Sequence, residues 1–122
     1  MPAGPAVSAG TVRRLHEVDA ESAPRVASGM PEMDRVLGGG LVRGAVILIG
    51  GDPGIGKSTL LLQLAARLAP RGQVLYVSGE ESSSQVRGRA ERVGAVVDGL
   101  SLAATTDLET ALAAIESLRP VL

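Results

Sequence analysis

The sequence predicts an α/β protein in which helices flank a parallel sheet. Short apolar runs alternate along the chain with longer amphipathic segments, which is the pattern of β-α-β units. A glycine-rich loop joins the first strong apolar run to a leucine-rich helix. Of the 122 residues, 45% are hydrophobic and 20% are charged, an ordinary balance for a globular domain. The chain is therefore long enough to form one compact core.

The first elements can be placed from glycine, proline and apolar residues. Residues 1–12 are mostly small residues and proline, which predicts a flexible tail before a domain at 13–122. "SGMPEMDRVLGGGL" predicts a short helix, with Pro31 in its first turn and Gly38 at its end. "AVILI", residues 45–49, is apolar on both alternating faces, which predicts a central strand covered on both sides.

The rest of the chain repeats the alternation. The helix after the glycine-rich loop is expected to bury Leu60, Leu61, Leu64 and Leu68 and to end at Pro70. Beyond it the sequence predicts, in order, a strand at 73–77, a helix at 85–94, a strand at 100–104, a helix from a T-x-x-E capping box at Thr106 to about residue 118, and the start of a fourth strand at 121–122.

Composition excludes several classes of protein. The chain has no cysteine, so it predicts neither a disulfide scaffold nor a thiolate zinc site within these residues. It has no apolar run of membrane-spanning length and no signal-peptide pattern at the N-terminus, which favours a cytoplasmic protein with no membrane partner. A net charge of -1 argues against a surface that binds polyanions nonspecifically.

The glycine-rich loop predicts a site for a nucleoside triphosphate and Mg²⁺. It matches G-x-x-x-x-G-K-[ST], in which backbone N–H groups and a helix N-terminus surround phosphate oxygens. Lys57, the only lysine among twelve basic residues, is expected to reach the β and γ phosphates. Ser58 is expected to bind Mg²⁺, and Thr59 to assist at the α phosphate. The expected binding residues are Gly51, Asp52, Pro53, Gly54, Ile55, Gly56, Lys57, Ser58 and Thr59.

Two acidic residues follow the strand predicted at 73–77. Glu80 and Glu81 would stand at the same end of the sheet as the glycine-rich loop, where one of them could orient the water that attacks the γ phosphate, with Glu80 preferred. The alternative is that both favour the start of the next helix through its dipole. Arg87, Arg89 and Arg92 on that helix suit either a partner or nucleic-acid phosphate, or a solvated face.

Longer stretches resemble a known family. "RVASGMPEMDRVLGGGLVRGAVILIGGDPGIGKSTLLLQLA" and "LYVSGEESSSQVRGRAERVG" look like the N-terminal half of the RecA-like ATPase core of the RadA (Sms) family of bacterial DNA repair proteins. The resemblance implies a cytoplasmic, DNA-stimulated ATPase that processes branched DNA in recombinational repair as a homo-oligomer. It implies ATP and Mg²⁺ as cofactors, phosphate contacts from Lys57, and a catalytic glutamate at Glu80 or Glu81. The residues of the loop and of "SGEES" favour this family over a circadian-clock or replicative-helicase relative.

The chain also departs from that family. The family's four-cysteine zinc module is absent, and the acidic strand end that completes the magnesium site, the Lys-Asn-Arg-Phe-Gly motif and the protease-like domain would follow Leu122. We therefore expect a partial ATP-binding core that binds nucleotide with little or no hydrolysis. With Tyr76 as the single aromatic residue, DNA binding by this chain alone should be weak. The alternative is a non-catalytic remnant or interaction module.

Overall fold

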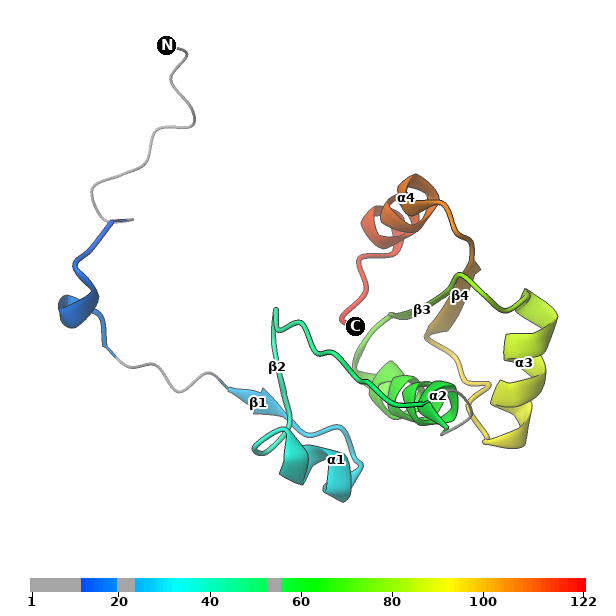
Figure 1. Cartoon of the computed structure of the whole chain (residues 1–122), viewed down its shortest axis with the longest axis horizontal. Helices are drawn as coiled ribbons and strands as arrows, with labels where there is room; N and C mark the ends of the chain where they lie inside the picture. Colours follow the sequence, from blue (N-terminus) through cyan, green and yellow to red (C-terminus); the bar gives the residue numbers. More distant parts are fainter. Residues whose placement is uncertain (1–11, 20–23, 53–55) are drawn as a thin grey trace, which may run out of the picture.

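The computed structural model describes residues 12–19, 24–52 and 56–122. The tail predicted at 1–12 therefore lies, apart from Val12, outside the described residues. From α2 onward the elements follow the expected alternation (Figure 1). In chain order, the elements are the short 3-10 helix η1 (Leu15–Glu17), β1 (Arg25–Val26), α1 (Pro31–Val36), β2 (Leu41–Val42), α2 (Lys57–Leu68), η2 (Ala69–Arg71), β3 (Val74–Ser78), α3 (Ser83–Arg92), β4 (Leu100–Ala104) and α4 (Leu108–Leu118).

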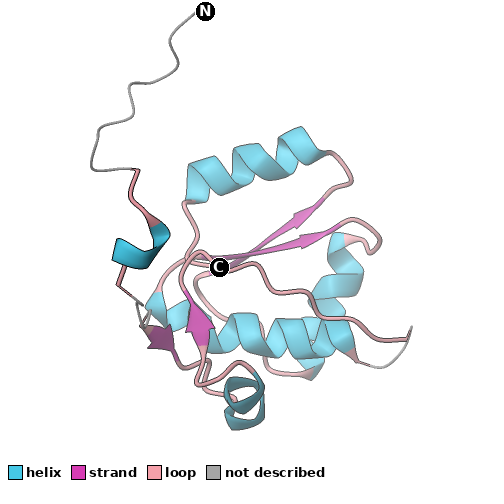
Figure 2. Ribbon diagram, turned by 60° about the vertical axis from the view of Figure 1, so that its left-hand side comes forward, coloured by secondary structure: helices cyan, strands magenta, loops and turns pink. Residues whose placement is uncertain are grey.

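The centre of the molecule is a parallel pair of strands. β3 and β4 run side by side in a register from Val74 opposite Leu100 to Ser78 opposite Ala104. The helix α3 connects them, so the three elements form a β-α-β unit. In Figure 2, α4 lies on one side of these strands, and α2 and α3 lie on the other. The predicted α/β class with a parallel sheet flanked by helices is confirmed.

Helix α2 is the element around which the core forms. One side of it carries Leu64 and Leu68, which pack with Val74 of β3 into a cluster that α1 and β2 extend. Another side carries Leu62, which packs with Val86 and two alanines from α3 and the residues after it. Leu62 is only 2% exposed, whereas Leu61 lies at the surface. The prediction that Leu61 is buried was wrong, and it omitted Leu62. The reason is that α2 buries two faces, one in each cluster.

Residues 45–49 do not form the predicted central strand. No strand is assigned there, and the side chains of Val46 and Leu48 are 97% and 94% exposed. A strand needs a neighbour to accept and donate its backbone hydrogen bonds. Within the described residues β3 and β4 pair with each other, and neither pairs with 45–49. The prediction was wrong because an apolar sequence alone does not supply that neighbour.

The C-terminal residues lie along the other edge of β3. The amide of Val121 donates to the carbonyl of Gln73 at 2.7 Å, and the amide of Leu75 donates to the carbonyl of Leu122 at 2.9 Å. Residues 73 and 75 direct these groups away from β4, because backbone groups alternate between the two edges of a strand. The chain therefore begins to pair with β3 where the start of a further strand is expected.

Two local features differ from the sequence-based expectations. Strands β1 and β2 form an antiparallel pair that was not predicted, since two residues are too few for a periodicity. The cap of α4 is Asp107 rather than Thr106: its carboxylate accepts hydrogen bonds from the amide of Glu109 and the hydroxyl of Thr110. Aspartate is as effective an N-cap as threonine, and here it stands nearer the first helical turn.

Candidate functional site

The glycine-rich loop leads directly into α2. Gly56, the last loop residue, has a φ of 93°, which is a left-handed conformation that favours glycine. The helix then begins at Lys57 with no side-chain cap and no acidic residue in its first turn. Its first N–H groups and the positive end of its dipole thus remain available to an anion. A helix start that is left open in this way can accept an anion such as a phosphate group.

The side chain of Lys57 reaches the first residue of the motif. Its Nζ donates a hydrogen bond to the carbonyl oxygen of Gly51 at 2.6 Å. The bond joins the first residue of the motif to the first residue of α2, although six residues separate them in sequence. Within the described residues the ammonium has this one neutral acceptor, and its other N–H groups can donate to a phosphate oxygen.

The other expected binding residues that the structure describes lie before residue 53 and after residue 55. Gly51 and Asp52, before residue 53, are exposed. Ser58 and Thr59 lie half-buried in the first turn of α2. Pro53, Gly54 and Ile55 lie outside the described residues. Within the part of the chain that is described, no group of three or more His, Asp or Glu side chains is placed to hold a metal ion.

The loop after β3 separates the two candidate glutamates. The side chain of Glu81 forms an ion pair with Arg89, with Oε1 2.8 Å from NH1, and its backbone amide donates to Ser78 Oγ. Glu80 is exposed and forms no hydrogen bond or ion pair within the described residues. The preference for Glu80 as the water-positioning residue stays a prediction, but the two side chains now have different surroundings.

The start of α3 does not use either glutamate. Ser82 is its N-cap, and Ser82 and Gln85 form a reciprocal capping box. The first turn of the helix contains no acidic residue. Sequence reasoning missed this box, although its signature, S-x-x-Q before a helix, is present in "SSSQ". It also missed the pairing of Arg89, which connects residues eight apart and has no local sequence signal.

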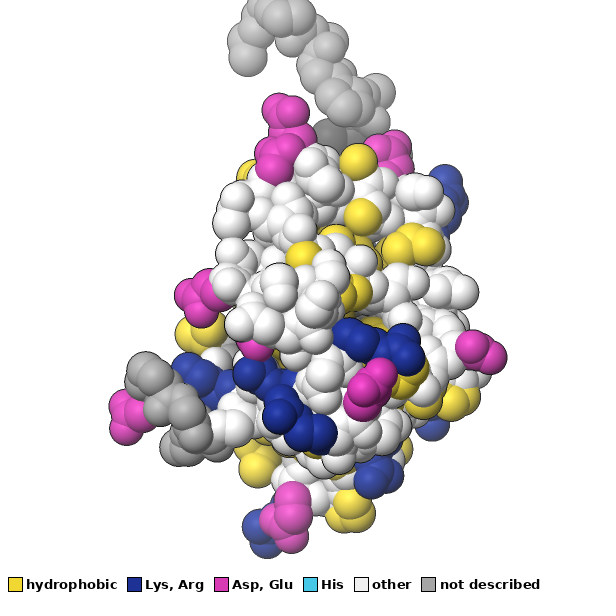
Figure 3. All heavy atoms as spheres, turned by 90° about the vertical axis from the view of Figure 1, so that its right-hand side faces the viewer, with side chains coloured by type: hydrophobic (Ala, Val, Ile, Leu, Met, Phe, Trp, Pro, Cys, Tyr) yellow, Lys and Arg dark blue, Asp and Glu magenta, His cyan; other side chains and the backbone are white. Residues whose placement is uncertain are grey.

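The start of α2 and the loop after β3 lie toward the same side of the molecule. In Figure 2 the strands point toward the end at which α2 begins, as expected for ligand sites at the carboxyl ends of parallel strands. Figure 3 shows Lys and Arg side chains gathered on the face that includes α3, with acidic side chains between them. Arg87 pairs with Glu91, and Arg89 with Glu81, so part of this positive charge is already neutralised.

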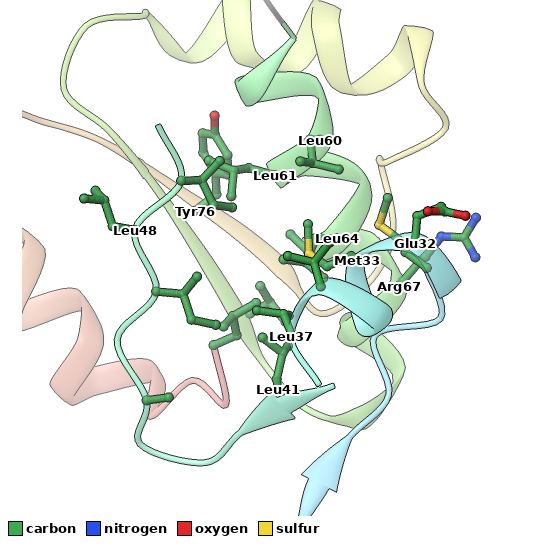
Figure 4. Close-up of a pocket in the computed structure, with 18 of the residues that line it drawn as sticks. Glu32, Met33, Leu37, Leu41, Leu48, Leu60, Leu61, Leu64, Arg67 and Tyr76 are labelled. Atoms are coloured by element: carbon green, nitrogen blue, oxygen red, sulfur yellow. The ribbon is translucent and has the colours of Figure 1, made fainter. Parts of the chain in front are cut away.

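An open apolar cleft lies beside this region, between α1, α2 and β3. It is open, has a volume of about 1030 Å³ and is lined mainly by apolar side chains of α1, α2, β3 and residues 45–50. In Figure 4, Leu61, Leu64 and Met33 surround it, while Leu48 points away to the other side of its segment. Such a lining suits packed hydrocarbon and offers little to a triphosphate. The cleft is therefore the space between β3 and the unpaired segment, not the phosphate site.

The parallel sheet and the glycine-rich loop before α2 define a RecA-like, P-loop type of ATPase fold. The family model described as "ATPase: KaiC" matches residues 26–115, which is more than half of the chain. The chain belongs to the KaiC ATPase family. In the part that is described, none of the helices has both the length and the apolar character needed to span a bilayer.

Curated relatives carry the name DNA repair protein RadA. The protein from Brucella abortus is 57% identical over 98 residues, which cover 80% of this chain and 21% of that relative. Those from Halalkalibacterium halodurans and Pseudomonas aeruginosa are 53% and 51% identical over 109 residues each, covering 88% and 89% of this chain and 24% of each relative. The resemblance expected from the sequence is confirmed, and the chain spans about a quarter of the length of these proteins.

Proposed function

We propose that this chain is the ATP-binding part of a RadA-like, DNA-dependent ATPase that acts in recombinational DNA repair on branched intermediates. The observation that carries the proposal is the contact of Lys57 Nζ with Gly51 O at the uncapped start of α2. The contact keeps a cation at the start of α2, beside backbone N–H groups that have no side-chain cap, and a triphosphate is bound by such a combination. The relatives named DNA repair protein RadA, which are 57% and 53% identical to this chain, support a role in DNA repair.

The residues that are present suit ATP, and they offer one ligand for Mg²⁺. The loop from Gly51 to Thr59 would hold the phosphates, with Lys57 at the β and γ phosphates. Ser58 carries a hydroxyl in the first turn of α2 and has no hydrogen-bond partner within the described residues, so it can bind the cation. When bound, Mg²⁺ neutralises phosphate charge and orients the γ phosphate for attack.

Hydrolysis requires a residue that orients water and a well-bound Mg²⁺, in addition to the groups that bind the phosphates. Glu80 is proposed to orient the attacking water, because it is exposed and unpaired in the described structure. Ser58 alone is a poor magnesium site, since Mg²⁺ prefers to have carboxylates among its ligands and no acidic cluster is present in the described residues. We propose that the 122-residue chain binds nucleotide with little or no turnover.

The wider properties of the family are part of the same proposal. The complete protein would work in the cytoplasm, bind DNA and assemble as a homo-oligomer, with residues 13–122 as a partial ATP-binding domain. Within this chain DNA binding should be weak, because Arg87 and Arg89 are paired to carboxylates and Tyr76 lies in β3.

The alternative is a non-catalytic remnant or interaction module. The observation in its favour is the exposed apolar segment at 45–49, which leaves the sheet unfinished on the side of the phosphate loop. Such a chain would cover a partner's oligomer without binding nucleotide strongly. The two candidates therefore differ first in nucleotide affinity.

Thermal and chemical unfolding with nucleotide separates them. If the loop binds Mg-ATP, a concentration 100 times the dissociation constant should raise the free energy of unfolding by about 2.7 kcal/mol. No change at millimolar nucleotide would rule out the proposed function and favour the interaction module. Steady-state phosphate release, with and without DNA, should stay at background. A DNA-stimulated rate that disappears in Lys57→Ala would show that the chain hydrolyses ATP after all.

A further inference from the structure

We propose that Arg89 is a positioning residue whose ion pair with Glu81 holds the loop after β3, so that Glu81 serves the loop and Glu80 is left to contact the attacking water. The inference rests on the proposed function for the role of Glu80. The latch itself, meaning the Arg89–Glu81 pair, rests on geometry alone. Arg89 of α3 would then shape the nucleotide site without contacting the nucleotide.

The Arg89–Glu81 pair differs from the other ion pairs of the described residues. NH1 and Oε1 are 2.8 Å apart, and the two side chains are only 30% and 24% exposed. In each of the other three pairs both side chains are more than half exposed. Charged hydrogen bonds strengthen as water is excluded from them, so this pair is the one expected to restrain the chain.

The latch is one of several hydrogen bonds that restrain the short loop after β3. Ser78 Oγ accepts a hydrogen bond from the amide of Glu81 at 3.2 Å. The amide of Ser82 donates to Gln85 Oε1 at 2.9 Å. Glu81 is therefore fixed through its backbone and its side chain, and the next residue is fixed to α3. Glu80 directly precedes these anchored residues, so its backbone position is largely determined by them.

The chemistry of the two carboxylates follows from this difference. A carboxylate oxygen bonded to a guanidinium has to give up part of that bond before it accepts a hydrogen bond from water. Glu81 is committed in this way. Glu80 has both oxygens available and stands at the carboxyl end of β3, on the side where α2 begins. The structure thus divides the tasks of two adjacent, identical residues.

The test is nuclear magnetic resonance on the 122-residue chain, with Arg89→Gln and Glu81→Gln as variants. The first readout is hydrogen exchange at the amides of Glu81 and Ser82. The second is the chemical-shift difference of the Glu80 amide between Mg-ADP and a non-hydrolysable Mg-ATP analogue, which reports on the γ phosphate. Arg87→Gln is the matched control, because it removes an exposed ion pair from the same helix.

Both latch variants should exchange these amides about threefold faster, the size expected for a partly exposed ion pair. They should also lose the γ-phosphate-dependent shift at Glu80 while keeping the dissociation constant for Mg-ADP. Arg87→Gln should change neither readout. The reversed pair, Glu81→Arg with Arg89→Glu, should restore both, which a general loss of stability would not allow.

Two failures can be told apart. Unchanged exchange and an unchanged Glu80 shift in Arg89→Gln and Glu81→Gln would overturn the latch, whatever the chain binds. Absence of nucleotide binding by the wild-type chain would overturn the proposed function, and with it the role given to Glu80, while the exchange rates would still decide whether the loop is held. A γ-phosphate-dependent shift that follows Glu81 instead of Glu80 would reverse the assignment of the two residues.

Discussion

The ammonium of Lys57 lies 2.6 Å from the carbonyl oxygen of Gly51. This hydrogen bond joins the first residue of the glycine-rich motif to the first residue of α2. A cation held in place loses little conformational freedom when the ligand binds, which favours affinity.

Replacing Lys57 with alanine should abolish the stabilisation by Mg-ATP, because both the cation and its hydrogen bond to Gly51 are lost. At 100 times the wild-type dissociation constant the difference between the two chains should approach about 2.7 kcal/mol in the free energy of unfolding. Arg71→Ala removes one exposed positive charge from the end of η2 and should keep the response. Equal responses of Lys57→Ala and wild type in urea titrations would contradict the assignment.

Alanine at two glycines should act with opposite sign. Gly56 has a φ of 93°, so Gly56→Ala should lower the free energy of unfolding by about 1–2 kcal/mol and weaken Mg-ATP binding. Gly88 lies inside α3 and an added Cβ would meet no atom within 4 Å, so Gly88→Ala should raise stability by about 0.5–1 kcal/mol. Urea unfolding of the two variants measures both effects. A stabilised Gly56→Ala chain would show that the loop does not need this conformation.

Asp34 should contribute to the pH dependence of stability. The hydroxyl of Ser28, and then its amide, donate hydrogen bonds that hold the pKa of Asp34 below its ordinary value of 3.8. The contribution is therefore complete above about pH 4 and is lost as the pH falls through the lower folded-state pKa. The stability difference between wild type and Asp34→Asn should narrow in that range.

Urea unfolding from pH 7 to pH 3 measures this difference. Asp98→Asn is the matched control, since Asp98 is an exposed carboxylate with no hydrogen bond within the described residues. If the difference in the free energy of unfolding between wild type and Asp34→Asn is constant over the whole pH range, the hydrogen bonds from Ser28 do not favour the ionised carboxylate. Ser28 itself is only 1% exposed, so it is better left unchanged in this test.

The unpaired segment at 45–49 should tolerate polar residues in this chain. Leu48 is 94% exposed, so Leu48→Glu should change the free energy of unfolding by less than about 0.5 kcal/mol and should reduce self-association. Leu62→Ala, in the core between α2 and α3, should cost about 2–5 kcal/mol. Chemical unfolding and light scattering provide the two measurements. A large loss of stability in Leu48→Glu would show that the segment is packed in solution.

Much of the fold could be predicted from the sequence because the signals are local. Pro31, Gly38, Pro70 and Gly94 end or begin elements through their own backbone preferences, and the structure places helix boundaries near each of them. The strands at 73–77 and 100–104 were found within one residue, since each is a short apolar run between glycines and polar loops. The phosphate-loop motif likewise carries its geometry in adjacent residues.

The features that failed depend on partners distant in sequence. The apolar run at 45–49 has the composition of a central strand, yet pairing needs a neighbouring backbone that the described residues do not provide. The burial of Leu62 instead of Leu61 depends on where α3 packs against α2.

Periodicity and motifs within this chain therefore determined the class of fold and the identity of the candidate binding loop. The tertiary structure decided which strands pair, which leucines are buried and which glutamate is occupied. Glu80 and Glu81 show the reason most clearly: they are adjacent and chemically identical, and the contacts of Glu81 with Ser78 and with Arg89, eight residues after it, distinguish them. Contacts between distant residues arise from the packing of whole elements, which no local pattern encodes.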